Sequence, residues 1–128
     1  METCDIESIE FWRRSPEAVD HIESCRFSFP LDGKALLSVE RKEGGKNRDL
    51  SEKEKEEILR FLLSLNMEED LADFRAYEYE GDYDDYSLSF FLLVVFRDKT
   101  YFAVRGCSPR REKHFREILD YFGDWIRR

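Results

Sequence analysis

The chain has 128 residues, of which 41% are hydrophobic and 15% aromatic, and its formal net charge at pH 7 is −8. This composition excludes a disordered or fibrous protein, and the length predicts a single domain over residues 1–128. No apolar run approaches the roughly 20 residues that span a bilayer, and residues 1–10 lack the basic-then-apolar order of a secretion signal. We therefore expect a cytoplasmic protein that has no membrane partner.

The charge is unevenly distributed along the chain. Residues 1–50 hold 11 acidic and 8 basic side chains, residues 51–85 hold 13 and 4, and residues 86–128 hold 5 and 9. Because phosphate contacts dominate nucleic-acid binding, a chain with this acidic excess is not expected to bind nucleic acid directly. The cysteines are few and scattered, which fits free thiols in a reducing compartment better than a disulfide framework.

The first fifty residues predict two strands joined by a turn. Residues 1–15 fit an edge strand, one helical turn or a loosely attached N-terminal segment. Residues 22–29 alternate in polarity, as a half-buried strand does. Asp32-Gly33 then predicts a turn and residues 35–41 a second strand, whereas the polar residues 42–49 indicate a loop or a long hairpin end.

Two amphipathic helices follow from the spacing of apolar residues. Ser51 and Glu54 have the spacing of a capping box, and the apolar residues after them predict a helix over about 52–65. Ser108-Pro109 is a second helix-start signal and predicts a helix over about 109–126. Its apolar stripe consists of Phe115, Ile118, Leu119, Phe122 and Ile126.

The most regular stretch of the chain predicts a β-hairpin over about residues 86–105. Its first half alternates, and one face is apolar throughout: Tyr86, Leu88, Phe90, Leu92, Val94 and Phe96. The second face begins polar and becomes apolar at Phe91, Leu93 and Val95. We expect this hairpin to be the central pair of strands. The whole pattern predicts an α+β fold, with an antiparallel sheet of four to five strands and both main helices packed mainly on one face.

The segments LSEKEKEEILRFLLSLN and VRGCSPRREKHFREILDYF, taken with the order of the elements, resemble a group of small, uncharacterised bacterial α+β domains. The resemblance covers about residues 22–122. In that group the second hairpin strand ends in a Gly-Ser-Asn-Ala-Tyr-Pro-like loop, to which only Gly106 and Pro109 correspond here, with shorter spacing. The resemblance implies the fold and brings no known activity or catalytic residue.

The tract YEYEGDYDDY, residues 77–86, has the most unusual composition in the chain. Its carboxylates could occupy the places where phosphates bind on a basic protein, and its tyrosines could anchor the contact. The candidate partner-binding residues are Tyr77, Glu78, Tyr79, Glu80, Asp82, Tyr83, Asp84 and Asp85. The tract also fits a solvated loop or short edge strand. Its aspartates lack the spacing of an EF-hand, so we predict no metal site.

A basic cluster follows the hairpin and consists of Arg105, Arg110, Arg111, Lys113 and His114. Arginines at a helix N-terminus can hold a phosphate or carboxylate, although the cluster equally fits a solvated face. Cys107 lies within it, but no orienting third residue or oxyanion loop accompanies this thiol, so we assign no catalytic residue. The sequence contains no P-loop, GxGxxG, HExxH or CxxC motif, and we expect no cofactor.

These observations predict a small, acidic, non-enzymatic protein-interaction module. A specific version is a phage-like or bacterial inhibitor or immunity-type protein that blocks a basic, nucleic-acid-handling partner. One alternative is a small domain or enzyme that binds an anionic ligand through Arg105, Arg110 and Arg111. Another is a structural subunit that forms a homodimer through the second face of the hairpin.

Overall fold

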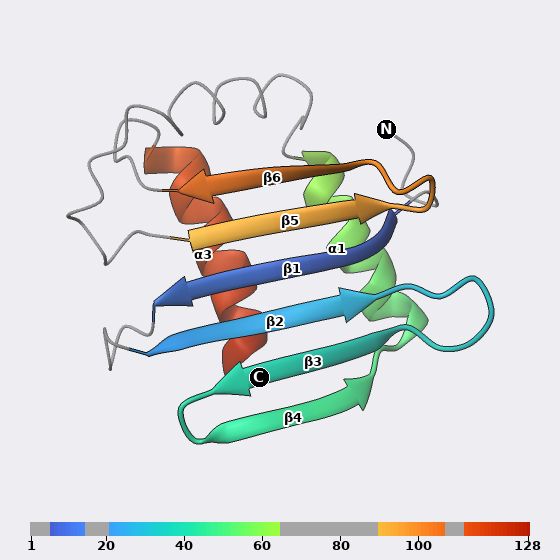
Figure 1. Cartoon of the computed structure of the whole chain (residues 1–128), viewed down its shortest axis with the longest axis horizontal. Coiled ribbons are helices and arrows are strands. Elements are labelled where there is room, and N and C mark those ends of the chain that lie inside the picture. Colours follow the sequence, from blue (N-terminus) through green and yellow to red (C-terminus); the bar gives the residue numbers. More distant parts are fainter. Residues whose placement is uncertain (1–5, 15–20, 65–89, 107–111) are drawn as a thin grey trace.

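The structure, a computed structural model, describes residues 6–14, 21–64, 90–106 and 112–128. These residues form a six-stranded antiparallel sheet, in the order β4-β3-β2-β1-β5-β6, with two helices behind it (Figure 1). The elements are β1 (Ile6–Arg14), β2 (Ile22–Ser28), β3 (Leu36–Arg41), β4 (Gly44–Asp49), α1 (Glu52–Ser64), β5 (Phe90–Phe96), β6 (Tyr101–Gly106) and α3 (Glu112–Arg127). The predicted α+β class, the antiparallel sheet and the two helices on one face are confirmed.

The N-terminal strand β1 lies inside the sheet, between β2 and β5. The expectation of an edge strand, a helical turn or a loosely attached segment is therefore wrong for residues 6–14. The register shifts between Ile6 and Ser8, as at a β-bulge, so Ile6 and Ile9 both face the core although they are three residues apart. This shift hides the strand from a search for strict alternation.

The hairpin β5–β6 consequently flanks the sheet and is not its central pair. β5 pairs with β1, and β6 is the outermost described strand on that side. The alternation itself is confirmed within the described residues, since Phe90, Leu92 and Val94 are buried. Residues 86–89 of the predicted hairpin lie outside the described residues.

The sheet has one strand more than the four to five predicted. The additional strand is β4, which occupies residues that the sequence indicates to be a loop or a long hairpin end. It pairs with β3 from Leu36–Asp49 to Arg41–Gly44, and all six of its residues are exposed. Gly44 has φ +124°, a backbone conformation that favours glycine, and this allows the turn after β3. Because β4 packs no side chain into the core, its sequence carries no alternation.

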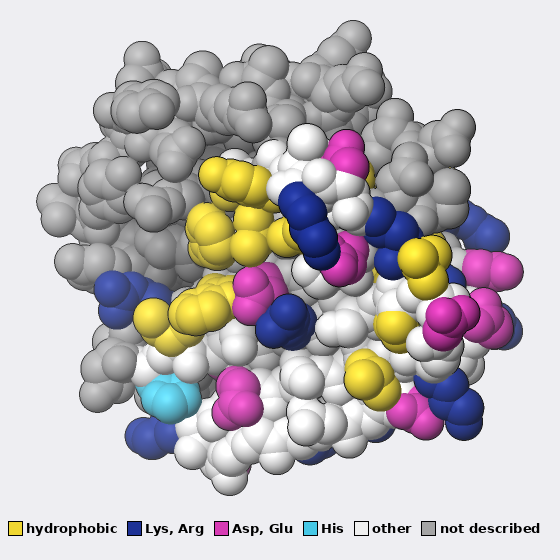
Figure 2. Space-filling model, turned by 45° about the vertical axis from the view of Figure 1, so that its right-hand side comes forward, with side chains coloured by type: hydrophobic (Ala, Val, Ile, Leu, Met, Phe, Trp, Pro, Cys, Tyr) yellow, Lys and Arg dark blue, Asp and Glu magenta, His cyan; other side chains and the backbone are white. Residues whose placement is uncertain are grey.

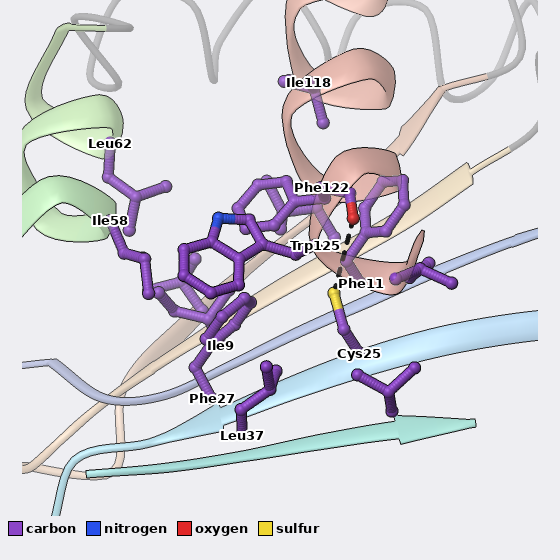
Figure 3. Close-up of a cluster of buried hydrophobic side chains, with 14 of the residues drawn as sticks. Ile9, Phe11, Cys25, Phe27, Leu37, Ile58, Leu62, Ile118, Phe122 and Trp125 are labelled. Atoms are coloured by element: carbon purple, nitrogen blue, oxygen red, sulfur yellow. Dashed lines mark hydrogen bonds between the residues drawn. The ribbon is translucent and has the colours of Figure 1, made fainter. Parts of the chain in front are cut away.

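Both helices pack on the same face of the sheet and enclose an aromatic core (Figure 3). The ring of Phe122 stacks on Phe11 with centroids 5.2 Å apart, and the ring of Trp125 meets Phe27 edge-on at 5.4 Å. α1 contributes Ile58 and Leu62, which are fully buried. Its predicted capping box is confirmed: Ser51 Oγ accepts from Glu54 N at 3.1 Å, and Glu54 Oε1 accepts from Ser51 N at 3.1 Å. Neither described helix covers the opposite face of the sheet.

Candidate protein-interaction surface

The sheet face that points away from α1 and α3, here called the open face, carries a continuous apolar region over β1, β5 and β6. Trp12 on β1 lies opposite Phe91 on β5. Further along β5, Leu93 pairs with Ala103 and Val95 with Tyr101, both on β6. Side chains at paired positions of neighbouring strands lie on the same face of the sheet. These side chains therefore adjoin one another across three strands.

Several of these side chains are exposed to a degree that is unusual for large apolar groups. Trp12 is 43% exposed and Tyr101 65%, while Phe91, Leu93 and Val95 between them are partly buried. Ile22 at 51% and Leu36 at 46% extend the exposed apolar surface onto β2 and β3. Figure 2, an oblique view of this face, shows hydrophobic side chains gathered beside isolated acidic and basic ones. Contiguous exposed apolar groups of this kind are typical of protein-binding surfaces.

The other half of the open face is polar and nearly balanced in charge. β2 and β3 present serines there, together with Arg26 and Glu40. Glu10 on β1 is the cross-strand neighbour of Arg26, which places opposite charges side by side. Among the described side chains, Arg14 and Arg26 stand at positions of this face together with Glu10, Glu40 and Asp49, so these side chains come within one charge of neutral.

A shallow hollow of about 530 Å³ adjoins the apolar region at the end of the sheet where β5 turns into β6. It is lined by Glu7, Ser8, Arg26, Ser28, Phe29, Pro30, Leu36, Val95 and Lys99. At its margin, Lys99 Nζ donates to the Glu7 carboxylate at 2.9 Å. Because Val95 and Leu36 both line it, the hollow connects the two apolar parts of the open face.

A second hollow, of about 370 Å³, lies between α1 and the loop after β2. Its lining includes Glu52, Lys55, Glu56 and Arg97. The Arg97 guanidinium donates from Nη2 to the Phe29 carbonyl at 2.7 Å, which holds this side chain against the loop. The residues that line this hollow include no Ser, Thr, Cys or His.

The two sites predicted from sequence fall largely outside the described residues. The acidic tract, residues 77–86, lies outside them entirely, as do Arg110 and Arg111 of the basic cluster. Arg105 is in β6, at the position that pairs with Phe91, and Lys113 and His114 are in the first turn of α3. The described residues therefore give only the position of Arg105 in β6, and the basic cluster stays a prediction.

The part of the chain that the structure describes contains no group of three or more His, Cys, Asp or Glu side chains arranged to hold a metal ion. Within the same residues, neither helix combines the length and apolar character needed to cross a membrane. Cys25 is buried, its Sγ donates to the Phe122 carbonyl at 3.8 Å, and burial raises the pKa of its thiol. Such a thiol is inert as a nucleophile.

Comparison with protein-family models, with curated proteins and with solved structures found no match to this chain. The resemblance to small bacterial α+β domains therefore stays a prediction, and no residue receives a role from a relative.

The sequence predicts only part of the open face. It shows that the second face of the hairpin is apolar, but it does not assign Trp12 to that face. The signal was present, because Phe11 and Trp12 are adjacent and neighbouring strand residues point to opposite faces. Two adjacent large aromatic residues in an interior strand place one of them in the core and the other on the open face.

Proposed function

We propose that this protein is a non-enzymatic protein-interaction module that binds through the open face of its sheet. The observation that carries the proposal is the apolar region in which Trp12 and Tyr101 remain exposed over two neighbours of β5. Tryptophan and tyrosine are enriched among residues that dominate binding energy, because they bury a large area with few rotatable bonds. The polar half of the same face supplies the rim that such interfaces have.

The proposal is tested by comparing capture of partners by three purified proteins: the wild type, the open-face variant Trp12→Ser with Tyr101→Ser, and the control Leu63→Ser. Leu63 is a matched control, since it is 50% exposed and lies on α1, which packs on the other face of the sheet. Each captured protein is then purified and titrated against all three by calorimetry. We expect the open-face variant to lose at least tenfold in affinity and the control to bind like the wild type. Equal affinity for the three proteins would refute the proposed surface.

A second candidate function is the inhibition of a basic, nucleic-acid-handling protein through the acidic tract. The observation that favours it is the concentration of acidity: residues 65–89 hold nine acidic side chains and one basic one, whereas the described residues hold 16 acidic and 18 basic. The excess negative charge of the chain is thus confined to segments outside the described sheet and helices. A partner selected by that charge would be basic.

This candidate is tested with the variant Asp82→Asn, Asp84→Asn, Asp85→Asn and with a control of equal charge, Glu43→Gln, Glu52→Gln, Glu56→Gln. The three control residues are exposed, on the turn after β3 and on α1. Binding to the basic partner should weaken with added salt, and it should weaken further in the tract variant but not in the control. Equal losses in the two variants would show that only net charge matters, and would remove the tract as a site.

A further inference from the structure

We infer that the open face binds a second copy of this chain, so that two sheets pack face to face with the helices on the outside. This inference rests on the proposed function in one respect, that the open face is a binding surface, and it names the occupant. The charge of the open face, the pairing of its strands and the size of the contact favour a second copy as the occupant.

The charge of the open face favours a second copy over a partner of opposite charge. The chain as a whole carries −8, yet this face is within one charge of neutral, and its neighbours Glu10 and Arg26 compensate one another. A face selected to bind a basic or acidic partner would carry an excess of one sign. A face that meets its own copy must avoid such an excess, because every unpaired charge would meet a region of the same sign.

The pairing of the strands allows the apolar region of one copy to pack against the same region of a second copy. Its centre is β5, with Leu93 between Glu10 of β1 and Ala103 of β6. A two-fold axis parallel to β5 lays β1 of one copy over β6 of the other. Trp12 and Tyr101 then both fall inside the contact, and the polar half formed by β2 and β3 becomes its rim. The same patch serves both copies, as a two-fold interface requires.

The size of the overlap suits a weak dimer. With the axis along β5, only β1, β5 and β6 among the described strands overlap, and two strand spacings of about 4.8 Å and six residues of about 3.4 Å give a flat footprint of about 200 Å². Side chains that stand off the sheet raise the accessible surface above this footprint, but it stays below the roughly 800 Å² that each partner buries in a standard interface. Because the contact is small, substitutions at its centre should be strongly felt.

Sedimentation equilibrium from about 1 to 200 μM tests the inference on the full chain. We expect the wild type and Leu63→Ser to dimerise, and Trp12→Ser with Tyr101→Ser to lose at least tenfold in dimer affinity. Circular dichroism checks that each variant is folded.

A disulfide crosslink gives a second readout. Leu93→Cys in a Cys4→Ser, Cys107→Ser background should form an intermolecular disulfide under mild oxidation, because Leu93 lies close to the expected axis. Lys46→Cys on β4, far from that axis, is its control.

Salt separates this inference from the proposals above. Raising the salt concentration screens the repulsion between two chains of charge −8, so dimer affinity should rise, whereas binding of a basic partner should fall. A wild type that is monomeric at every concentration overturns the dimer. If it then loses a different partner in the open-face variant, the face remains a binding surface. A dimer that persists unchanged in the open-face variant, or that crosslinks through Lys46→Cys as readily as through Leu93→Cys, also overturns the inference.

Discussion

Arg13 on β1 and Gly123 on α3 occupy adjoining space: a Cβ atom added at Gly123 would collide with Nη1 of Arg13. The guanidinium is held there, because Arg13 Nε donates to Glu23 Oε1 at 2.6 Å and both side chains are about nine-tenths buried. A glycine in the middle of a helix weakens it by about 1 kcal/mol relative to alanine. The close approach of β1 to α3 explains why α3 carries one.

This contact predicts that Gly123→Ala destabilises the protein although it improves helix propensity. The added methyl group must displace the buried Arg13–Glu23 ion pair, and we expect a net loss of about 1–3 kcal/mol in the free energy of unfolding, measured with urea. In an Arg13→Met background the obstruction is smaller and the same substitution should be neutral or stabilising. A gain of about 1 kcal/mol from Gly123→Ala in the wild type would contradict the structure.

The N-terminus of α1 predicts a pH-dependent contribution from Glu54. The hydrogen bond from the Arg48 guanidinium is the main cause that lowers the pKa of Glu54 from 4.5 to about 2, and the Ser51 cap adds to it. A lowered folded-state pKa stabilises the fold above the unfolded pKa of about 4.5, and this stabilisation is lost as the pH falls toward 2. Because the pair is partly exposed and screened, we expect about 1 kcal/mol.

The measurement compares urea unfolding of the wild type and Glu54→Gln from pH 7 to pH 2. Glutamine preserves the capping geometry and removes the charge, so the difference in unfolding free energy should be present at pH 7 and should vanish near pH 2. Glu56→Gln is the control, since Glu56 is exposed on the same helix. A difference that is independent of pH would show that the Arg48–Glu54 ion pair contributes nothing.

The turn between β5 and β6 predicts that position 99 strongly prefers residues that tolerate a positive φ. Lys99 has φ +71°, and its backbone N donates to the Phe96 carbonyl at 2.9 Å, so the left-handed conformation is part of the turn. Asparagine tolerates this conformation, whereas a β-branched residue does not. We expect Lys99→Val to be less stable than Lys99→Asn by about 1–2 kcal/mol. Both variants lose the ion pair with Glu7, so their difference isolates the backbone. Equal thermal stability of the two would contradict the assigned turn.

Local signals in the sequence predicted the elements that local interactions define. The capping box of Ser51 and Glu54, the buried face of β2 and the apolar stripe of α3 each depend on residues a few positions apart. The structure confirms the first two, and it confirms the stripe from Ile118 onward, where the side chains are described. The interior place of β1 depends on pairing with β5, a strand far along the chain, and its bulge disguises the alternation. β4 is stabilised by pairing with β3 rather than by burial, so its polar sequence cannot be distinguished from a loop.

The candidate surface was predictable only in part for the same reason. Phe91, Leu93 and Val95 were recognisable as a second apolar face, but which helices cover which face is a property of the whole fold. Trp12 could be assigned to the open face only once β1 was known to pair with β5. The role of Gly123 likewise depends on Arg13, which lies at the other end of the chain.

The buried thiol of Cys25 should report on unfolding of the protein. It is fully buried beneath α3, its Sγ donates to the Phe122 carbonyl at 3.8 Å, and burial raises the pKa of the thiol above its ordinary value (Figure 3). With Cys4→Ser and Cys107→Ser, Cys25 is the single thiol of the chain. We expect a maleimide to label it at pH 8 at least a hundredfold more slowly than in 6 M guanidinium, because the reactive thiolate forms only when the core opens.

The variant Ile58→Ala tests the same thiol in a less stable protein. It removes buried side-chain volume on α1 and leaves the residues of β2 unchanged, so the labelling rate of Cys25 should rise in step with the equilibrium constant for unfolding. The labelling is measured by mass spectrometry. Rapid labelling of the folded protein would contradict the buried position of Cys25.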